Sequence, residues 1–332
     1  MQRRISLLVF LLFVSCQLPF FSQRTTNVHL VIDAGSSGTR FCPYEVDEQC
    51  NHLDVSQNCF SVPASGGLAD LKLEEINQVM NQGFQKLEGI KIEKAIILGT
   101  GGFRRLPDYK QKQQIDLIRS SAISRFPDTE VRVLTGKQEA QLAYLAMVAF
   151  RNGKTDHKIL ETGGATIQIA GWEWEPASAP AGLNAMRELS GPPTSCAEDT
   201  NPSPQRFQEC QEALRKVLRA QPWFSAFFRN EEAESVYALG SSWKSIFALA
   251  GDSEISREDL RKQGTQICNS SVKDIVDAGV PEKFAPASCY LHSYQYVLAS
   301  ELKIHELKAG DGSWPPGAAI SDFFSGCTLR AD

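Results

Sequence analysis

Two acidic residues of this sequence each lead into a glycine-rich turn. Asp33 follows the apolar run 28–32 and precedes the turn Gly-Ser-Ser-Gly at 35–38. Glu161 likewise precedes a pair of glycines at 163–164. Glycine lets the backbone approach a phosphate closely, turn N–H groups bind anions, and carboxylate oxygens are ligands that Mg²⁺ and Ca²⁺ prefer. The two segments predict a cleft whose turns bind a chain of phosphates and whose acids hold a divalent cation through its water shell.

A third glycine-rich segment and an acidic helix start complete the predicted site. Residues 99–105 read G-T-G-G-F-R-R after an apolar strand, and Arg104 is placed to neutralise the charge of a terminal phosphate. Glu139 stands in the first turn of the apolar helical pattern 136–150, so its carboxylate is predicted to project into the cleft as a general base. Taken singly, a glycine turn is most often a hairpin tip, and a glutamate at a helix start most often favours the helix dipole. The recurrence of the turn pattern favours the functional interpretation.

The elements expected around these residues alternate between strand and helix. Strands are expected at 28–32, 39–46, 94–98 and 131–134, and a strand, a glycine turn and a returning strand are expected within 159–169. Helices are expected at 73–87, 108–125, 136–150, 205–219, 241–250, 255–267 and 287–301. Such alternation predicts an α/β protein with mixed sheets flanked by helices and ligands at the carboxyl ends of the strands. The Gly- and Pro-rich segment 176–204 is expected to be a loop.

The recurring turn pattern also indicates two duplicated lobes. A polar break at 152–155 predicts an N-terminal lobe at 28–153 and a C-terminal lobe at 154–312. The segment at about 313–332 is expected to return to the first lobe.

The beginning of the chain is typical of an export signal. Two arginines precede the apolar run 5–14, and the predicted signal segment is 1–22. The apolar run is about half of the roughly 20 residues that a membrane-spanning helix needs, so no further transmembrane anchor is expected. Lipidation of Cys16 is the weaker alternative to cleavage. A secreted or cell-envelope protein is therefore expected.

The cysteines and the net charge support this interpretation. Eight of the nine cysteines follow the signal segment, which suits an oxidising compartment and disulfide bonds better than zinc. Cys196 with Cys210 is the preferred local pair, and Cys42 with Cys50 or Cys59 is next. A formal net charge of -5 argues against a nucleic-acid partner. The chain is expected to be a monomer.

Five ordered blocks of the sequence resemble the apyrase family, the ectonucleoside triphosphate diphosphohydrolases. Residues 33–40 read D-A-G-S-S-G-T-R, as in the first family signature, and the similar blocks that follow lie at 99–104, 135–140, 161–168 and 314–319. The resemblance implies two actin-like (ribonuclease H-like) lobes with the active-site cleft between them. The sequence departs from the family at Glu161, which replaces an aspartate, at Thr162, which replaces an apolar residue, and at Gly101 and Phe103. These departures bear most on the metal site.

The resemblance implies hydrolysis of nucleoside tri- and diphosphates with Mg²⁺ or Ca²⁺ as cofactor. Glu139, Arg104 and Gln168 are the expected catalytic residues, and Asp33 and Glu161 are the expected metal-binding residues. The phosphate-binding residues expected in the three loops are Gly35, Ser36, Ser37, Gly38, Thr39, Thr100, Gly163, Gly164, Ala165 and Thr166. Two alternatives remain: an exopolyphosphatase or guanosine-pentaphosphate phosphatase of the same superfold, and a nucleotide-binding module with impaired catalysis.

Overall fold

The computed structural model describes residues 26–36, 38–47, 53–54, 59–191, 196, 202–228 and 232–324. The predicted signal at 1–22, the last eight residues of the predicted returning segment, and Cys16, Ser37, Cys50 and Cys327 lie outside the described residues. No helix within the described ranges is long and apolar enough to cross a membrane.

The first sheet carries the first predicted turn. Its order is β3-β2-β1-β5-β6, with β4 also paired to β2. The strands are β1 (Thr26–Ala34), β2 (Thr39–Asp47), β3 (Leu53–Asp54), β4 (Phe60–Val62), β5 (Ile92–Gly99) and β6 (Glu130–Val133). β1 and β2 form the predicted antiparallel hairpin, and β5 and β6 continue the sheet in parallel with β1.

Both faces of this sheet are buried, and the alternation along β1 shows how. Leu30 and Ile32 pack with helices α1 (Leu73–Lys86) and α3 (Asp108–Ala122) on one face, whereas Val31 belongs to the core on the other face. Successive residues of a strand point to opposite faces, so a strand buried on both sides is a continuous apolar run. The apolar run that predicted β1 has this physical cause.

The second sheet repeats the plan of the first. Its order is β11-β12-β10-β7-β8-β9. The strands are β7 (Lys158–Thr162), β8 (Ile167–Gly171), β9 (Trp174–Ala179), β10 (Ala233–Leu239), β11 (Glu254–Ser256) and β12 (Ile304–Ala309). In each sheet an antiparallel unit, β1–β4 in the first and β7–β9 in the second, is followed by two strands parallel to its first strand, β5 and β6 or β10 and β12, and β11 adds an antiparallel edge to the second sheet. The duplication that the turn pattern predicted is therefore present in the topology.

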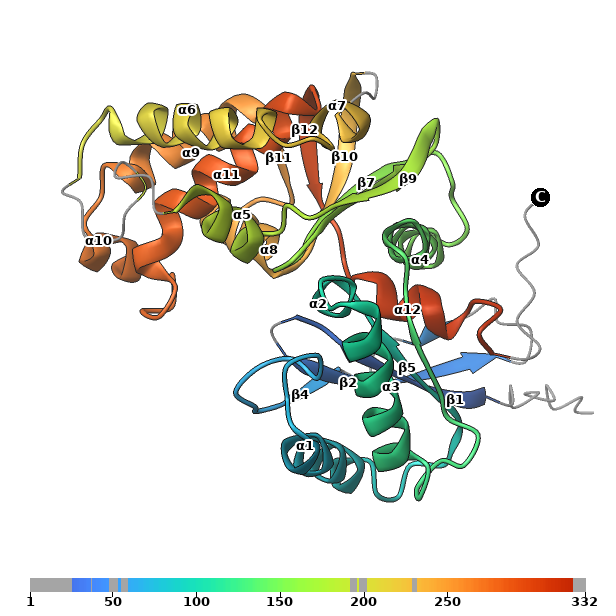
Figure 1. Cartoon of the computed structure of the whole chain (residues 1–332). Coiled ribbons are helices and arrows are strands. Elements are labelled where there is room, and N and C mark those ends of the chain that lie inside the picture. Colours follow the sequence, from blue (N-terminus) through green and yellow to red (C-terminus); the bar gives the residue numbers. More distant parts are fainter. Residues whose placement is uncertain are drawn as a thin grey trace, which may run out of the picture.

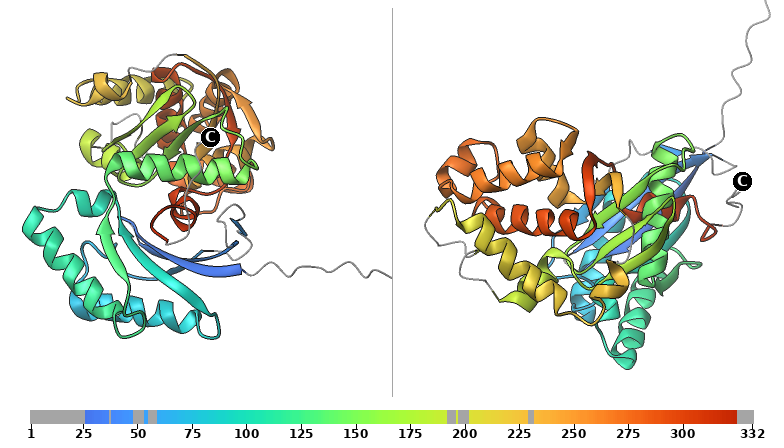
Figure 2. Two further views of the ribbon diagram at one scale, coloured as in Figure 1. Left: turned by 90° about the vertical axis from the view of Figure 1, so that its right-hand side faces the viewer. Right: turned by 90° about the horizontal axis from the view of Figure 1, so that it is seen from above.

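Two helices lie between the sheets and join them (Figures 1 and 2). Helix α4 (Gly136–Phe150) packs against β7, β8 and β9, and α12 (Trp314–Ala319) packs against α4, β1 and β2. One core cluster contains residues of both sheets and of both helices. The helices approach closely because a side chain at Gly317 would collide with the backbone of Leu142. The predicted lobe division at 153/154 falls in the turn after α4 and stays a prediction.

The helices between β9 and α12 form the outer side of the second lobe (Figure 1). They are α5 (Leu183–Ser190), α6 (Arg206–Arg219), α7 (Phe224–Phe227), α8 (Ser241–Ala250), α9 (Arg257–Cys268), α10 (Val272–Asp277) and α11 (Ser288–Glu301). Of these, α6, α8, α9 and α11 were expected, whereas α5, α7 and α10 were not. The expectation of a loop over 176–204 was wrong in part, because β9 ends at Ala179 and α5 follows it. β9 is held by hydrogen bonds to β8, which a local sequence pattern does not contain.

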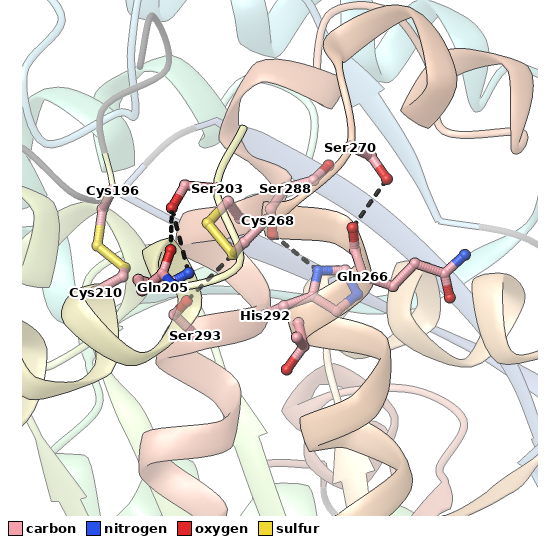
Figure 3. The surroundings of a disulfide bond; sticks show 12 residues. Cys196, Ser203, Gln205, Cys210, Gln266, Cys268, Ser270, Ser288, His292 and Ser293 are labelled. Atoms are coloured by element: carbon pink, nitrogen blue, oxygen red, sulfur yellow. Dashed lines mark hydrogen bonds between the residues drawn. A yellow bond between two sulfur atoms is a disulfide. The ribbon is translucent and has the colours of Figure 1, made fainter. Parts of the chain in front are cut away.

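Three disulfide bonds lie within the described residues: Cys196–Cys210 is the preferred predicted pair, and Cys42–Cys59 is one of the two pairings considered for Cys42. Cys42–Cys59 joins β2 to the residue before β4. Cys196–Cys210 joins Cys196, which lies between α5 and α6 in the sequence, to α6. The third, Cys268–Cys289, joins α9 to α11. Figure 3 shows Cys268 beside Ser293 of α11. The Sγ atom of Cys268 lies 3.8 Å from the Oγ atom of Ser293.

Candidate active site

The loops that follow the parallel strands of the two sheets meet in one place. β1 and β5 of the first sheet and β7 of the second end at the predicted phosphate loops, as expected for carboxyl ends of strands in α/β folds. A Cβ atom at Gly101 would lie 2.9 Å from Cβ of Ala165, and one at Gly102 would lie 3.0 Å from Cα of Ser36. A Cβ atom at Gly164 would lie 3.4 Å from Oγ of Ser36. The three loops touch because glycine stands at these contacts.

Two adjoining cavities lie among these loops. The inner chamber has a volume of about 80 Å³ and the outer chamber one of about 420 Å³. They share a wall that includes Asp33, Glu161 and Ser313. The predicted residues that line the inner chamber are Asp33, Gly35, Ser36, Thr100, Glu139, Glu161, Gly163, Gly164, Ala165, Thr166 and Gln168.

The remaining predicted residues lie elsewhere. Gly38 lines the outer chamber. Thr39 is fully buried in β2, and its hydroxyl has no hydrogen-bond partner among the described residues. Arg104 lines neither chamber, and its guanidinium group contacts the carboxylate of Glu139.

Asp33 is 1% exposed at the end of β1 and is paired with a residue across its own hairpin. The strand register places Arg40 directly opposite Asp33, so both side chains project on the same face. Nε of Arg40 donates a hydrogen bond to Oδ2 of Asp33 at 2.8 Å, and Nη2 donates to the same oxygen. Oδ1 has no hydrogen-bond partner in the described chain. Burial raises the pKa of Asp33 above its usual value, and the charge of Arg40 opposes this shift.

Glu139 is fixed by the start of helix α4. The hydroxyl of Thr135 accepts a hydrogen bond from the backbone N–H of Gln138, and the Gln138 side chain accepts one from the Thr135 N–H. This capping box begins the helix at a defined residue and places Glu139 in its first turn, 5% exposed. Burial raises the pKa of Glu139.

Arg104 opposes the rise in the pKa of Glu139. Its Nη1 donates to the carbonyl of Leu134 at 2.9 Å, and its Nη2 lies 2.8 Å from Oε2 of Glu139. That second contact is a charge contact without hydrogen-bond geometry, so Oε2 has no donor among the described groups. The structure brings Arg104 to the predicted base, and its predicted contact with a terminal phosphate stays a prediction.

Glu161 ends β7 and is paired with a distant part of the chain. Its Oε1 accepts a hydrogen bond from Oγ of Ser313, the residue before α12, while Oε2 has no partner among the described residues. Burial, with the charge of Glu139 as the next cause, raises the pKa of Glu161 to about 8. In the metal-free protein at neutral pH, this carboxyl group therefore holds a proton most of the time.

Gln168 lies opposite Glu161 in the second hairpin, as Arg40 lies opposite Asp33 in the first. Its Nε2 donates to Oγ1 of Thr166 at 2.6 Å. Both side chains are buried and line the inner chamber. The hydrogen bond thus holds Gln168 and Thr166, both predicted site residues, in a fixed arrangement beside Glu161.

Thr162, the second departure from the apyrase pattern, is held by a buried polar network. Nε1 of Trp243 donates to its Oγ1 at 3.0 Å, and its hydroxyl donates to Oε1 of Gln295 at 3.3 Å. Nε2 of Gln295 in turn donates to Oγ of Ser242 at 2.8 Å. Buried polar groups that are satisfied in this way rigidify their surroundings. The network fixes the second loop from α8 and α11.

The donor set of the inner chamber fits a divalent cation bound through water. Asp33 and Glu161 each have one buried oxygen without a hydrogen-bond partner among the described residues, whereas the corresponding oxygen of Glu139 lies 2.8 Å from the Arg104 guanidinium. Hard carboxylate oxygens of this kind suit Mg²⁺ or Ca²⁺. In the part of the chain that the structure describes, no group of three or more His, Cys, Asp or Glu is close enough to hold a metal directly. Contact through the water shell is the arrangement that these residues fit.

Arg40, Ser313 and Lys244 are site residues for which the sequence predicted no role. Arg40 and Ser313 line both chambers, and Lys244 lines the outer chamber. Arg40 carried a signal, because a hairpin with this turn places it opposite Asp33. Ser313 and Lys244 reach the site only through the tertiary fold.

No protein-family model matches the chain, and no curated protein sequence matches it. Solved structures do. A Ppx/GppA family member from Aquifex aeolicus has a TM-score of 0.62 at 16% identity and covers 89% of this chain and 96% of that one. For an exopolyphosphatase from Cytophaga hutchinsonii the TM-score is 0.62 at 14% identity, covering 88% of this chain and 96% of that one. Nucleoside triphosphate hydrolases from Neospora caninum give a TM-score of 0.55 at 12% identity, with 89% and 92% covered.

At these identities the likeness concerns the fold. The chain has the two-lobed, actin-like fold of these structures, as the sequence predicted. The finer resemblance to apyrases stays a sequence-based expectation.

Proposed function

We propose that the protein hydrolyses phosphoanhydride bonds and removes the terminal phosphate from a linear chain of phosphates. The inner chamber carries this proposal, because three buried carboxylates and the glycine-rich loops of both lobes line about 80 Å³ of space. Backbone N–H groups at such loops suit phosphate oxygens, and the carboxylate oxygens of Asp33 and Glu161 that accept no hydrogen bond within the described chain suit a cation that neutralises those phosphates. A chain of phosphates uses both features at once.

Glu139 is the proposed general base. Its burial favours the protonated form, which makes the carboxylate a better proton acceptor for water than an exposed glutamate. The Gln168 amide and the Thr166 hydroxyl, 2.6 Å apart, orient the water and the phosphate. Water attacks the terminal phosphorus in line and its proton passes to Glu139, while the bond from that phosphorus to the bridging oxygen breaks and the shortened phosphate chain leaves. A divalent cation bound at Asp33 and Glu161 would neutralise charge on the phosphate oxygens.

Inorganic polyphosphate and guanosine pentaphosphate are the first candidate substrates. The structures named as Ppx/GppA or exopolyphosphatase proteins have TM-scores of 0.57 to 0.64, against 0.55 for the Neospora hydrolases. The outer chamber supports this order. Tyr44 is the one aromatic side chain among its described lining residues, and the Tyr44 hydroxyl lies 3.3 Å from Sγ of Cys59. Such a wall has two cationic side chains, Arg40 and Lys244, but little surface for stacking a nucleobase.

Nucleoside tri- and diphosphates are the second candidate substrates. The string at 33–40 favours them, because it resembles the first signature of the apyrases residue for residue. The fold shared with the Neospora hydrolases is compatible with this choice.

A phosphate-release panel tests the proposal. The full chain is assayed with polyphosphate, guanosine pentaphosphate, ATP and ADP, each with Mg²⁺, Ca²⁺ or a chelator. We expect metal-dependent release, fastest from polyphosphate or guanosine pentaphosphate. Faster release from ATP and ADP would support the apyrase alternative. Nucleotide binding without release from any substrate would refute hydrolysis and leave the impaired binding module.

A further inference from the structure

The hydroxyl of Ser313 has no role in capping the helix that follows it. Ser313 is the N-cap residue of α12, a position where a serine normally accepts a hydrogen bond from the N–H of the second or third helical residue. Those residues are Pro315 and Pro316, which have no N–H. The side chain makes no capping hydrogen bond.

Helix α4 in the same layer shows the usual arrangement. Its N-cap residue is Thr135. The backbone N–H of Gln138, the third helical residue, donates a hydrogen bond to Oγ1 of Thr135 at 3.2 Å. The two prolines of α12 remove that option for Ser313. Its hydroxyl instead donates to Oε1 of Glu161, 152 positions earlier in the chain.

The contact depends on the unusual length of the side chain at position 161. Glutamate is one methylene longer than aspartate, and here its carboxylate meets the segment between β12 and α12. With Oε1 occupied, Oε2 is the oxygen left without a hydrogen-bond partner among the described groups. Glu161 is 5% exposed and lines both chambers, so Oε2 is buried beside the space where a cation would bind.

We propose that Ser313 is a positioning residue for the metal site: its hydroxyl holds Oε1 of Glu161 and thereby keeps Oε2 available to the water shell of a divalent cation. The proposal deepens the proposed function and rests on it for the role of that cation. Residues that orient a metal-binding carboxylate typically change metal affinity about 10- to 100-fold when they are replaced. The hydrogen bond from Ser313 thus orients the glutamate side chain at position 161 for its role in binding the cation.

Metal binding without substrate tests the pair directly. The probe is Mn²⁺ alone, titrated calorimetrically into the full chain. Ser313→Val and Ser313→Thr form an isosteric pair that differs in the hydroxyl. We expect Ser313→Val to weaken Mn²⁺ binding about 10-fold, and Ser313→Thr to restore it. Ser321→Ala is the control, because it removes a buried hydroxyl at the other end of α12 that donates to the Ala318 carbonyl at 2.8 Å.

A double-mutant cycle separates positioning from a general effect on folding. Glu161→Asp shortens the side chain and breaks its contact with Ser313. Adding Ser313→Val to Glu161→Asp should then cause no further loss of Mn²⁺ affinity. Thermal unfolding in chelator checks that each variant is folded, and the threonine variant keeps the test usable if the valine variant is not.

The outcomes are distinct. Wild-type Mn²⁺ affinity in Ser313→Val, equal losses in both backgrounds, or no Mn²⁺ binding by the wild-type chain would each overturn the role of Ser313. If Ser313→Val and Ser313→Thr bind Mn²⁺ equally weakly, the hydroxyl is not what matters, which also overturns it. Absence of phosphate release from every substrate, with Mn²⁺ binding intact and sensitive to Ser313→Val, would refute the proposed function and support the positioning role.

Discussion

The two hairpins of the site share one backbone plan and treat their acids differently. Asp33 faces Arg40 across the first hairpin and forms an ion pair with it. Glu161 faces Gln168 across the second hairpin, but the Gln168 side chain donates its hydrogen bond to Thr166. The carboxylate of Glu161 instead accepts a hydrogen bond from Ser313. The first acid thus has a counter-charge within its own hairpin.

The second acid has no counter-charge within its own hairpin, and burial, with the charge of Glu139 as the next cause, raises its pKa to about 8. A duplicated frame therefore does not produce duplicated electrostatics. The residue opposite each acid decides whether the negative charge of that carboxylate is balanced within the hairpin, as by Arg40, or is left unbalanced there, as opposite Gln168. The following predictions test this difference.

The largest expected effect concerns the base, which comes from the helix between the sheets rather than from either hairpin. Glu139→Gln should lower phosphate release at least about 1000-fold, because a neutral amide cannot accept the proton of the attacking water. Mn²⁺ binding should persist, since Asp33 and Glu161 remain. The control is Glu130→Gln on the partly exposed edge of β6. Near-normal turnover by Glu139→Gln would remove Glu139 from the role of base.

Exchanging the length of each acid should affect the two hairpins unequally. Asp33→Glu places an extra methylene in a site that is 1% exposed and already filled by Arg40. We expect it to lower the free energy of unfolding by about 1–3 kcal/mol through overpacking. Glu161→Asp should cost less, about 0.5–1.5 kcal/mol, because it gives up one hydrogen bond to Ser313 and opens space only beside the existing chambers. Chemical denaturation of both variants in chelator gives the two values. Equal destabilisation would show that the two acids occupy equivalent surroundings.

The raised pKa of Glu161 predicts a pH dependence that Glu161→Gln should weaken. Between its ordinary pKa of 4.5 and about 8, folded Glu161 holds a proton that the unfolded chain has released. The metal-free protein should therefore lose stability as the pH rises through this window. Glu161→Gln removes that contribution, whereas Glu282→Gln, on an exposed residue, should not.

Thermal unfolding in chelator across this pH range measures the effect. An identical pH slope in the wild-type and Glu161→Gln chains would contradict the assignment of a proton to this carboxyl group.

The smallest effect is expected where the lobes meet at the surface. Arg105 and Glu188 form an ion pair between the first lobe and α5, with an N–O distance of 3.6 Å and both side chains exposed. Exposed pairs contribute about 0–1 kcal/mol, so Arg105→Ala should barely change stability or turnover. A large loss of turnover would show that this pair, rather than the loops at the acids, holds the lobes together over the site.

Local patterns made much of the frame predictable. Continuous apolar runs predicted β1 and β5, because strands buried on both faces are apolar throughout. The pattern at 136–150 predicted α4, with Glu139 in its first turn. β10 and β12 were missed, and so was β9, because pairing with neighbouring strands defines them more than their own composition does.

The sequence by itself determined the turns, the acids at their start and the doubling of this pattern, because these depend on short-range geometry and residue type. Only the tertiary structure decided the partners of Glu139 and Glu161. Arg104 reached Glu139 instead of lining a chamber, and Ser313 reached Glu161 from the end of the described chain. Such partners are set by the packing of α4 and α12 between the sheets, which brings together residues that no local spacing relates.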